Sequence, residues 1–178
     1  MTNIFIFHGC NGSPDANWFP WLKRELEARG HSVIVPQFPI MHDQKLDNWL
    51  SVMEQYKDRL EDSILIGHSL GATFILDLLE SFGIKVRSAY LIGGFIGKLG
   101  PDFDVFNSTF AEKDFDWDRI KQACGSFHVM ASDDDPYVPL SKAYELGESL
   151  GVSPIVLEGQ GHFMFFEFRY LLDGLKRI

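Results

Sequence analysis

The sequence predicts an α/β fold, with a mostly parallel sheet of about six strands and helices on both faces of the sheet. The first observation is that short continuous apolar runs, typical of strands buried on both faces, alternate with segments whose apolar residues recur at helical spacing. The second is that the chain has 178 residues, of which 46% are hydrophobic, which suits a single domain around one core.

The elements can be placed from these patterns. The predicted strands are residues 4–7, 33–35, 64–66, 89–92, 127–131 and 155–157. The predicted helices are residues 18–29, 46–60, 70–79, 117–123, 140–150 and 165–176. In a parallel sheet of this kind, ligands bind at the carboxyl ends of the strands. Functional residues should therefore lie in the loops that follow the strands.

Residues 93–116 form the least regular part of the chain. The segment is interrupted by Gly93, Gly94, Gly97, Gly100 and Pro101, and it carries Phe95, Phe103, Phe106, Phe110 and Phe115 without a steady period. We expect a short cap over the active site, because a long loop inside a compact domain is usually functional and the aromatic side chains argue against disorder. The alternative is a surface loop that its Phe side chains anchor to the core.

Composition excludes several classes of function. The formal net charge of -9, without a cluster of Lys or Arg, argues against a nucleic-acid partner or an anionic membrane surface. No apolar run is long enough to span a bilayer, and the first residues lack the basic leader of a signal peptide. Cys10 and Cys124 have no C-x-x-C spacing, so neither a zinc site nor a redox pair is indicated. We expect a cytoplasmic protein without a metal or another cofactor.

The candidate nucleophile is Ser69, in the sequence Gly-His-Ser-Leu-Gly over residues 67–71. An apolar strand ends here and a helical pattern begins, which is the context of a nucleophile elbow, where two glycines let strand and helix crowd together. The N–H of Leu70 opens the helix, so it is a candidate oxyanion donor. Because such a pentapeptide also occurs by chance, the other members of the site decide the matter.

A serine hydroxyl needs a neutral imidazole to take its proton, and the imidazole needs a carboxylate to orient it. His162 is the predicted base, because it follows the last strand and the adjacent Gly161 lets the turn approach Ser69. The other histidines fit this role less well: His31, His42 and His128 lie in or beside predicted elements, His68 should point away from Ser69, and His8 should brace its own loop.

Three acids follow the fifth predicted strand. Asp135 is the predicted triad acid, because Pro136 stiffens the backbone just after the carboxylate, and Asp134 is the alternative. An acidic run can also be a solvated loop or a weak cation site, and this interpretation fits Asp133 best.

The chain order Ser, Asp, His, with G-x-S-x-G first, is that of the α/β-hydrolase fold. Other motifs extend nearly from end to end: His8-Gly9 with Ser13-Pro14, Asn17-Trp18-Phe19-Pro20-Trp21, Gly67-His68-Ser69-Leu70-Gly71, Trp117 with Ile120, Ser132 with Asp134-Asp135-Pro136 and Val138-Pro139, and Gly161-His162-Phe163. On these residues the sequence resembles the small α/β-hydrolases that include the YdeN-like bacterial proteins and the retinoblastoma-binding serine hydrolase of animals.

The resemblance implies a compact α/β-hydrolase fold over residues 1–178, without a large cap, and a triad of Ser69, Asp135 and His162. It also implies that the residue after His-Gly supplies the second oxyanion N–H, which is Cys10, with Asn11 as the fallback. Retinoblastoma binding is not carried over, because neither cysteine lies in a Leu-x-Cys-x-Glu pattern.

These residues predict a serine hydrolase, most simply a carboxylesterase, that cleaves an ester, thioester or amide of a small molecule through an acyl-enzyme. Asn11, Trp18 and Phe95 are candidates for the substrate pocket, and short to medium acyl esters are the expected substrates. One alternative is a hydrolase-like binding module that uses the aromatic cap as its contact surface. Another is a metal hydrolase or phosphatase built on residues 133–135, although the chain lacks a second ligand cluster and a phosphate-cradling loop.

Overall fold

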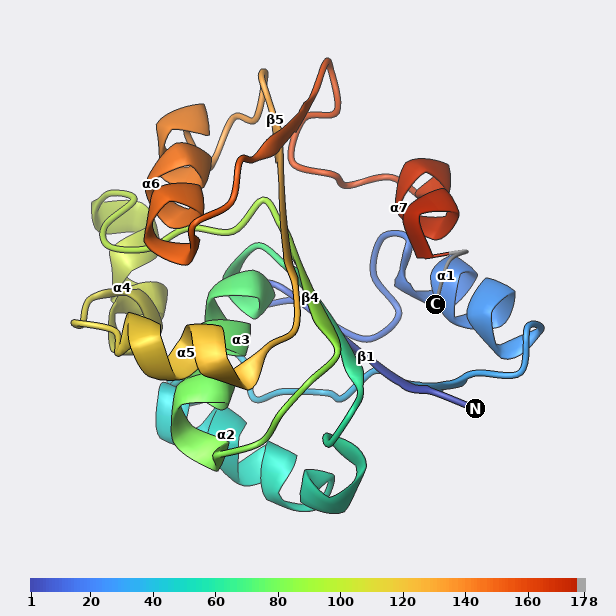
Figure 1. Ribbon diagram of the computed structural model, residues 1–178. Helices are drawn as coiled ribbons and strands as arrows, with labels where there is room; N and C mark the ends of the chain where they lie inside the picture. Colours follow the sequence, from blue (N-terminus) through green and yellow to red (C-terminus); the bar gives the residue numbers. More distant parts are fainter. Residues whose placement is uncertain (176–178) are drawn as a thin grey trace.

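Six short apolar segments pair into one parallel sheet in the computed structural model, which describes residues 1–175 (Figure 1). The strands are β1 (Asn3–Phe7), β2 (Ser32–Ile34), β3 (Ile64–His68), β4 (Ser88–Ile92), β5 (Phe127–Ser132) and β6 (Ile155–Leu157). Their order across the sheet is β2-β1-β3-β4-β5-β6, and each neighbouring pair is parallel. The predicted strands and the parallel sheet are confirmed.

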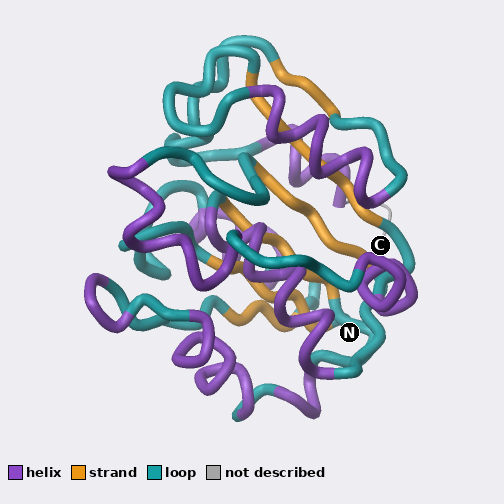
Figure 2. Tube along the Cα trace, turned by 90° about the vertical axis from the view of Figure 1, so that its left-hand side faces the viewer, coloured by secondary structure: helices purple, strands orange, loops and turns teal. Residues whose placement is uncertain are grey.

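Helices cover both faces of this sheet. The α-helices are α1 (Phe19–Glu27), α2 (Leu46–Glu54), α3 (Leu70–Phe82), α4 (Pro101–Ala111), α5 (Trp117–Ala123), α6 (Leu140–Leu150) and α7 (Arg169–Gly174). Short 3-10 helices lie at η1 (Met41–Asp43) and η2 (Lys57–Arg59). Figure 1 places α1 and α7 on one side of the strands and the other labelled helices on the opposite side, and Figure 2 shows helices lying across the strands.

Alternation along the strands divides the buried side chains into two cores. Ile4, Ile6, Ile64 and Ile66 face α1 and α7, together with Phe163 and Phe168. The intervening strand residues, such as Phe5, Phe7 and Leu65, face α2, α3, α5 and α6. Since successive side chains of a strand point to opposite faces, continuous apolar runs are what a sheet covered on both faces requires.

The centre of the second core is α3, which runs directly from the end of β3. Ten of its residues are buried, from Leu70 to Leu79. A Cβ on Gly71 would lie 2.4 Å from the Phe7 carbonyl oxygen on β1, and a Cβ on Gly67 would lie 2.4 Å from the Gly71 carbonyl oxygen. Neither position has room for a side chain, so the two glycines allow α3 to pack against the middle of the sheet.

Four predicted helices differ from the structure at their ends, and one of them is α3, which ends at Phe82 and not at residue 79. Helix α1 spans two fewer residues at its C-terminal end than predicted, and α2 ends at Glu54, with η2 following. Helix α7 begins at Arg169 and not at residue 165, because Phe163, Phe165 and Phe168 pack their rings against one another in an irregular segment before it. The predicted end of this helix, residue 176, lies outside the described residues.

The segment 93–116 is more regular than predicted, because α4 occupies residues 101–111. Gly100 precedes the helix with a φ of 123°, and Pro101 occupies its first turn. Proline is favoured there, since its missing N–H would have no partner in the helix. Phe103, Phe106 and Phe110 recur at the three- and four-residue spacing of one helical face, a pattern that the flanking glycines concealed.

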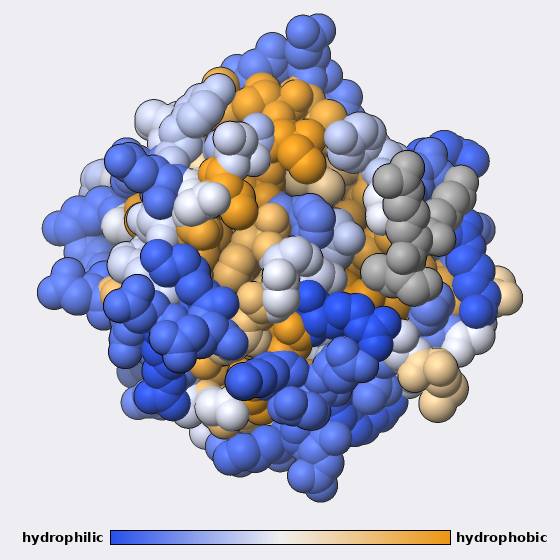
Figure 3. Space-filling view, in the orientation of Figure 1, coloured by the Kyte–Doolittle hydropathy of each residue, from blue (hydrophilic) through white to orange (hydrophobic). Residues whose placement is uncertain are grey.

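Hydrophilic side chains cover most of the surface in Figure 3, apart from an apolar band between the two layers of helices. The upper part of the band lies over β6, the edge strand, whose residues Ile155 to Leu157 are half-buried. Among the described residues, no helix has both the length and the apolar character needed to cross a bilayer.

Replacing Gly71 with alanine tests the contact between α3 and β1. In a helix alanine is otherwise favoured over glycine by about 1 kcal/mol, but the 2.4 Å approach to the Phe7 carbonyl oxygen requires backbone to move. We expect Gly71→Ala to lose about 3 kcal/mol or more of unfolding free energy in urea titrations. Gly174→Ala in α7 is the matched control, because a Cβ there meets nothing within 4 Å. Equal stability of the two variants would contradict this packing argument.

Candidate active site

Ser69 lies between β3 and α3, in the sharp turn that joins them. Its backbone has φ 56° and ψ -123°, which is costly for any residue with a Cβ. The Ser69 N–H donates to the Ile92 carbonyl at the end of β4, over 2.8 Å. A Cβ on Gly9 would lie 2.9 Å from the Ser69 Cβ, so the loop after β1 approaches this turn as closely as glycine allows. The local geometry is that of the predicted nucleophile elbow.

His162 is paired with Asp135. The imidazole Nδ1 donates to Asp135 Oδ2 over 2.7 Å, and the other carboxylate oxygen, Oδ1, accepts from the N–H groups of Tyr137 and Val138. Burial by itself would raise the pKa of Asp135, but the hydrogen bonds from His162, Val138 and Tyr137 outweigh it and hold the pKa below its usual value. The carboxylate is therefore ionised and leaves Nε2 of His162 free for a proton.

Gly93, at the end of β4, makes room for this pair. Its φ is 58°, and a Cβ on it would lie 3.3 Å from Cε1 of His162 and 3.6 Å from Asp135 Oδ2. The ring of Tyr137 contacts the His162 ring edge-on, at 5.2 Å between centroids.

The other two acids of the run hold the backbone of the His162 loop. Asp133 Oδ1 accepts from the Gly159 N–H over 2.9 Å, and Asp134 Oδ1 accepts from the Gly161 N–H over 2.7 Å. Ser132 donates to Asp134 and accepts from the Gln160 N–H. Asp133 is exposed, as expected for a solvated loop residue, and its carboxylate also binds a backbone N–H of the loop.

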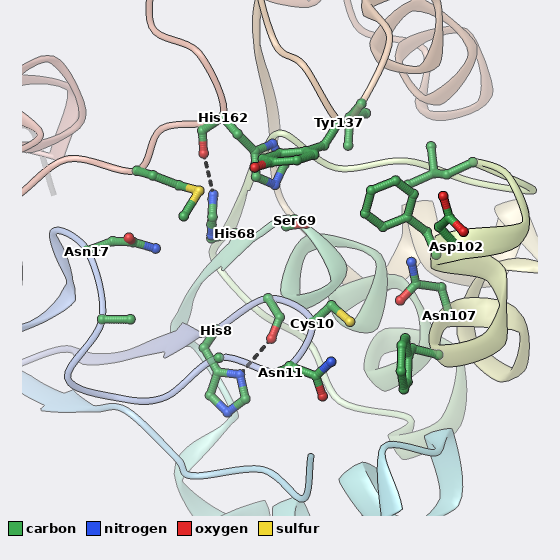
Figure 4. A pocket seen from close by; sticks show the side chains of 18 of the residues that line it. His8, Cys10, Asn11, Asn17, His68, Ser69, Asp102, Asn107, Tyr137 and His162 are labelled. Carbon is green, nitrogen blue, oxygen red and sulfur yellow. Dashed lines mark hydrogen bonds between the residues drawn. The ribbon is translucent and has the colours of Figure 1, made fainter. Parts of the chain in front are cut away.

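Two residues hold the same loop from its other side. His68 Nε2 donates to the His162 carbonyl oxygen over 2.8 Å, and Trp18 Nε1 donates to the Phe163 carbonyl oxygen over 3.1 Å (Figure 4 draws the first bond). Trp18 is completely buried in the core beneath α1. Its prediction as a substrate-pocket residue is wrong, because the indole is used to support the loop.

Two adjacent amides of the loop after β1 differ in their hydrogen bonding. The Asn11 N–H donates to Gln44 Oε1 over 2.7 Å, and Nε2 of the same Gln44 donates to Cys10 Sγ and to the Phe106 carbonyl oxygen. In residues 1–175, the N–H groups of Cys10 and Leu70 have no acceptor. The Asn11 N–H is therefore engaged, whereas the Cys10 N–H is available to a ligand.

A cavity of about 490 Å³ opens beside Ser69 and His162. Figure 4 shows side chains from the β1 loop, from α4 and from the Tyr137 and His162 segments around it. Asn11 lines the cavity as predicted. Phe95 does not: it is 1% exposed and packs in the core behind α3, where Thr73 donates to its carbonyl oxygen. Phe103 and Phe106 of α4 supply the aromatic walls instead.

Ser69 and His162 share this cavity without a direct bond. Among the described residues, the Ser69 hydroxyl has no hydrogen bond to His162. Catalytic hydrogen bonds are often long before a substrate binds, so the arrangement is compatible with the predicted triad.

Two further groups in the cavity are held uncharged. Burial lowers the pKa of His8, against the smaller raising effect of its bond to the Gly9 carbonyl oxygen, and His8 Nε2 accepts from the Phe38 N–H. His8 therefore braces its loop, as expected. Burial raises the pKa of the Cys10 thiol, and both cysteines are free thiols.

In residues 1–175, no three His, Cys, Asp or Glu side chains are grouped as a metal site would require.

Comparison with known proteins identifies the family. The family model described as serine hydrolase matches residues 4–167. The chain belongs to the serine hydrolase family. YdeN of Bacillus subtilis (strain 168), which is named as a hydrolase, is 30% identical over 164 residues, covering 90% of this chain and 85% of YdeN. The serine hydrolase RBBP9 of Rattus norvegicus is 26% identical over 178 residues, covering 98% of this chain and 94% of RBBP9.

Solved structures identify the fold. The crystal structure of the ydeN gene product of B. subtilis superposes with a TM-score of 0.90 at 28% identity, covering 99% of this chain and 98% of that one. A structure of Est1E from Butyrivibrio proteoclasticus with ferulic acid bound has a TM-score of 0.78 at 13% identity, covering 99% and 87%, a likeness of fold alone. The α/β-hydrolase fold predicted for this serine hydrolase is confirmed.

The sequence did not predict the supporting roles of several residues of the site. Asp134 was the alternative triad acid and Ser132 was part of a family motif, whereas in the structure Ser132, Asp133 and Asp134 bind the backbone of the His162 turn. Gln44 and Asn107 lie in segments without a motif, and only the folded chain brings Asn107 to the cavity wall and Gln44 to the loop behind it. His68 and Trp18 lie inside two of the family motifs, around Ser69 and at residues 17–21. Their position in these motifs was the one signal in the sequence that they support the site.

The pH dependence of stability tests the role of His68. Burial and the adjacent His162 lower the pKa of His68 to about 4, against smaller raising effects of the His162 carbonyl and Asp135. Because this pKa lies below the unfolded value of about 6.5, the unfolded chain binds more protons as the pH falls from 6.5 to 4, and stability is lost in that window.

We expect the wild type to lose about 2 kcal/mol more unfolding free energy than His68→Gln between pH 7.5 and pH 5. The glutamine amide can still donate to the His162 carbonyl oxygen, but it does not titrate. Urea unfolding at the two pH values measures the difference. The buried His8 also contributes to the loss of stability at low pH, but it is present in both proteins, so its contribution cancels in the comparison. Equal losses of stability in wild type and variant would contradict the prediction, because they would mean that folding does not lower the pKa of His68.

Proposed function

We propose that this serine hydrolase cleaves a carboxylic ester, or a related thioester or amide, of a small molecule through an acyl-enzyme on Ser69. The observation that carries the proposal is that Ser69 and His162 line one cavity, while Asp135 binds the far nitrogen of His162 at 2.7 Å. This pairing places the basic Nε2 on the side of the ring opposite the carboxylate, as nucleophilic catalysis by serine requires.

In the proposed reaction, Nε2 of His162 takes the proton of the Ser69 hydroxyl as Oγ forms a bond to the substrate carbonyl carbon. Asp135 fixes the proton on Nδ1 and stabilises the imidazolium. The carbonyl π bond becomes an oxyanion, which then re-forms the carbonyl as the bond to the leaving alkoxide breaks. His162 gives its Nε2 proton to that alkoxide. Water then attacks the acyl carbon while His162 takes its proton. The bond between the acyl carbon and Ser69 Oγ breaks, the carboxylic acid leaves, and His162 returns the proton to Oγ.

The backbone N–H groups of Leu70 and Cys10 are the proposed oxyanion donors. Leu70 is the first residue of α3, where the helix dipole favours negative charge, and neither N–H has an acceptor in the described chain. Gln44 supports this role by occupying the competing Asn11 N–H and by donating to the Cys10 sulfur. The elevated pKa of the Cys10 thiol agrees with a backbone role rather than a nucleophilic one.

The cavity favours a largely apolar and uncharged substrate. Its apolar walls include Leu99, Phe103, Phe106, Val138 and Met164. Asp102 is the ionisable acid on the wall, and no Lys or Arg of residues 1–175 lines the cavity, so an anionic substrate would have no counter-ion. Short to medium acyl esters remain the expected substrates.

Removal of the Ser69 hydroxyl tests the nucleophile. We expect Ser69→Ala to lose turnover of nitrophenyl esters by at least about a thousandfold, because no other hydroxyl can form the acyl-enzyme. A fluorophosphonate probe should label the wild type and leave Ser69→Ala unlabelled. Ser51→Ala on the exposed face of α2 is the control and should label fully. Full esterase activity in a folded Ser69→Ala protein would overturn the mechanism.

A pair of amide substitutions assigns the triad acid. In Asp135→Asn the partner of His162 Nδ1 loses its charge and can present an N–H, so kcat should fall by about ten thousandfold. In Asp134→Asn the side-chain oxygen can still accept from Gly161 N–H and Ser132, so the loss should stay below about tenfold. Steady-state kinetics on one ester suffices, and the reverse order of losses would make Asp134 the acid.

A further inference from the structure

Asn107 is a buried amide on the wall of the cavity. It lies on α4, is only 3% exposed, and is among the residues that line the cavity. Its Oδ1 is buried without a hydrogen-bond partner in the structure. In Figure 4 the amide points from α4 into the cavity, toward Cys10 and the region of Ser69.

The neighbouring amides on the same side of the cavity are already used. Asn11 Oδ1 accepts from the Met41 N–H over 2.8 Å. Gln44 bonds through both ends of its amide, to the Asn11 N–H on one side and to Cys10 Sγ and the Phe106 carbonyl oxygen on the other. Asn107 differs from these two residues because its Oδ1 accepts no hydrogen bond from the described residues.

A structural role does not account for Asn107. Burying a polar group without a partner costs free energy, and an apolar residue of similar volume would avoid that cost. The position lies next to Phe106, one turn after Phe103 and one turn before Phe110, so an apolar side chain would suit its surroundings. An unpartnered buried amide on the wall of a catalytic cavity therefore calls for a ligand that supplies the missing donor.

We propose that Asn107 is a specificity-determining residue that accepts a hydrogen bond from the substrate, and that the preferred substrates carry a neutral donor, an amide N–H or a hydroxyl. This inference rests on the proposed function. Rotation of the amide about its Cβ–Cγ bond presents Oδ1 to a substrate whose carbonyl carbon lies at Ser69. A site built to bond such a donor discriminates against the analogue that lacks it, because the buried acceptor is then left unpaired.

The charge around the cavity disfavours a substrate whose polar group is an anion. Asp102 is on the same helix and also lines the cavity, while no Lys or Arg among residues 1–175 does so. A carboxylic acid or a phosphate would be ionised and repelled there, whereas a secondary amide or an alcohol brings a donor without negative charge.

Two pairs of esters test the inference on either side of the scissile bond. The ethyl esters of N-acetylglycine and of 4-oxopentanoic acid differ only by N–H against CH₂ in the acyl group. The acetates of N-acetylethanolamine and of 5-hydroxypentan-2-one differ in the same way in the alcohol. For each pair, the ratio of kcat/KM for the N–H ester to that for the CH₂ ester is measured in wild type and in Asn107→Leu.

We expect Asn107→Leu to lower this ratio on the order of tenfold for at least one pair, with turnover of the CH₂ ester retained. Phe106→Leu is the control: it changes the volume of the same wall without touching the amide, so it should alter both members of a pair equally. Asn107→Leu should also unfold at no lower urea concentration than wild type, because leucine removes an unpaired polar group.

Other outcomes separate the inference from the proposed function. If fluorophosphonate labels Ser69 and the wild type hydrolyses the esters, but the ratios are the same in Asn107→Leu, the role of Asn107 is overturned and the hydrolase mechanism stands. If Asn107→Leu loses both esters of each pair equally, Asn107 is a structural residue and the inference also falls. A folded wild type that neither labels nor hydrolyses overturns the proposed function and the inference together.

Discussion

The close approach of α3 to the sheet is the constraint on which the site depends. Gly71 lies against the carbonyl oxygen of Phe7, and Gly67 lies against the backbone of Gly71, so any side chain at either position would separate helix and strand. This contact holds Ser69 in a backbone conformation that is unfavourable for serine. Burial of α3 from Leu70 to Leu79 supplies the packing energy that maintains it. The core therefore stabilises a strained turn at the carboxyl edge of the sheet.

The same edge carries the loop of His162, which is held by hydrogen bonds in addition to the packing of Phe163 in the core. Asp133 and Asp134 accept from its N–H groups, and His68 and Trp18 donate to its carbonyl oxygens. Asp135 then orients the imidazole. Three consecutive acids thus share one task, in which the first two position the backbone and the third positions the ring. Such support matters because a catalytic group must be held within a fraction of an ångström of its working geometry.

Two walls of the cavity are linked to each other by hydrogen bonds. The β1 loop is tied to α4 through Gln44, which bonds to Asn11, Cys10 and the Phe106 carbonyl oxygen. The segment that supplies α4 therefore belongs to the site itself: it brings two Phe side chains and the Asn107 amide over Ser69. Because the β1 loop is linked to α4, the fit of a substrate under α4 bears directly on the N–H groups proposed to hold the oxyanion.

The sequence by itself determined the strands, most helices, the elbow around Ser69, and His162 and Asp135 as partners. These follow from local patterns: apolar runs, helical spacing, paired glycines, and polar residues directly after strands. Tertiary structure alone decided which aromatic residues reach the cavity. Trp18 and Phe95 were predicted there, yet both are buried in the core, because a hydrophobic side chain suits a pocket wall and a core equally well. It also brought Gln44 and Asn107 to the site, since hydrogen bonds between residues 33 and 62 positions apart depend on how the segments pack. Local sequence contains no record of such partners.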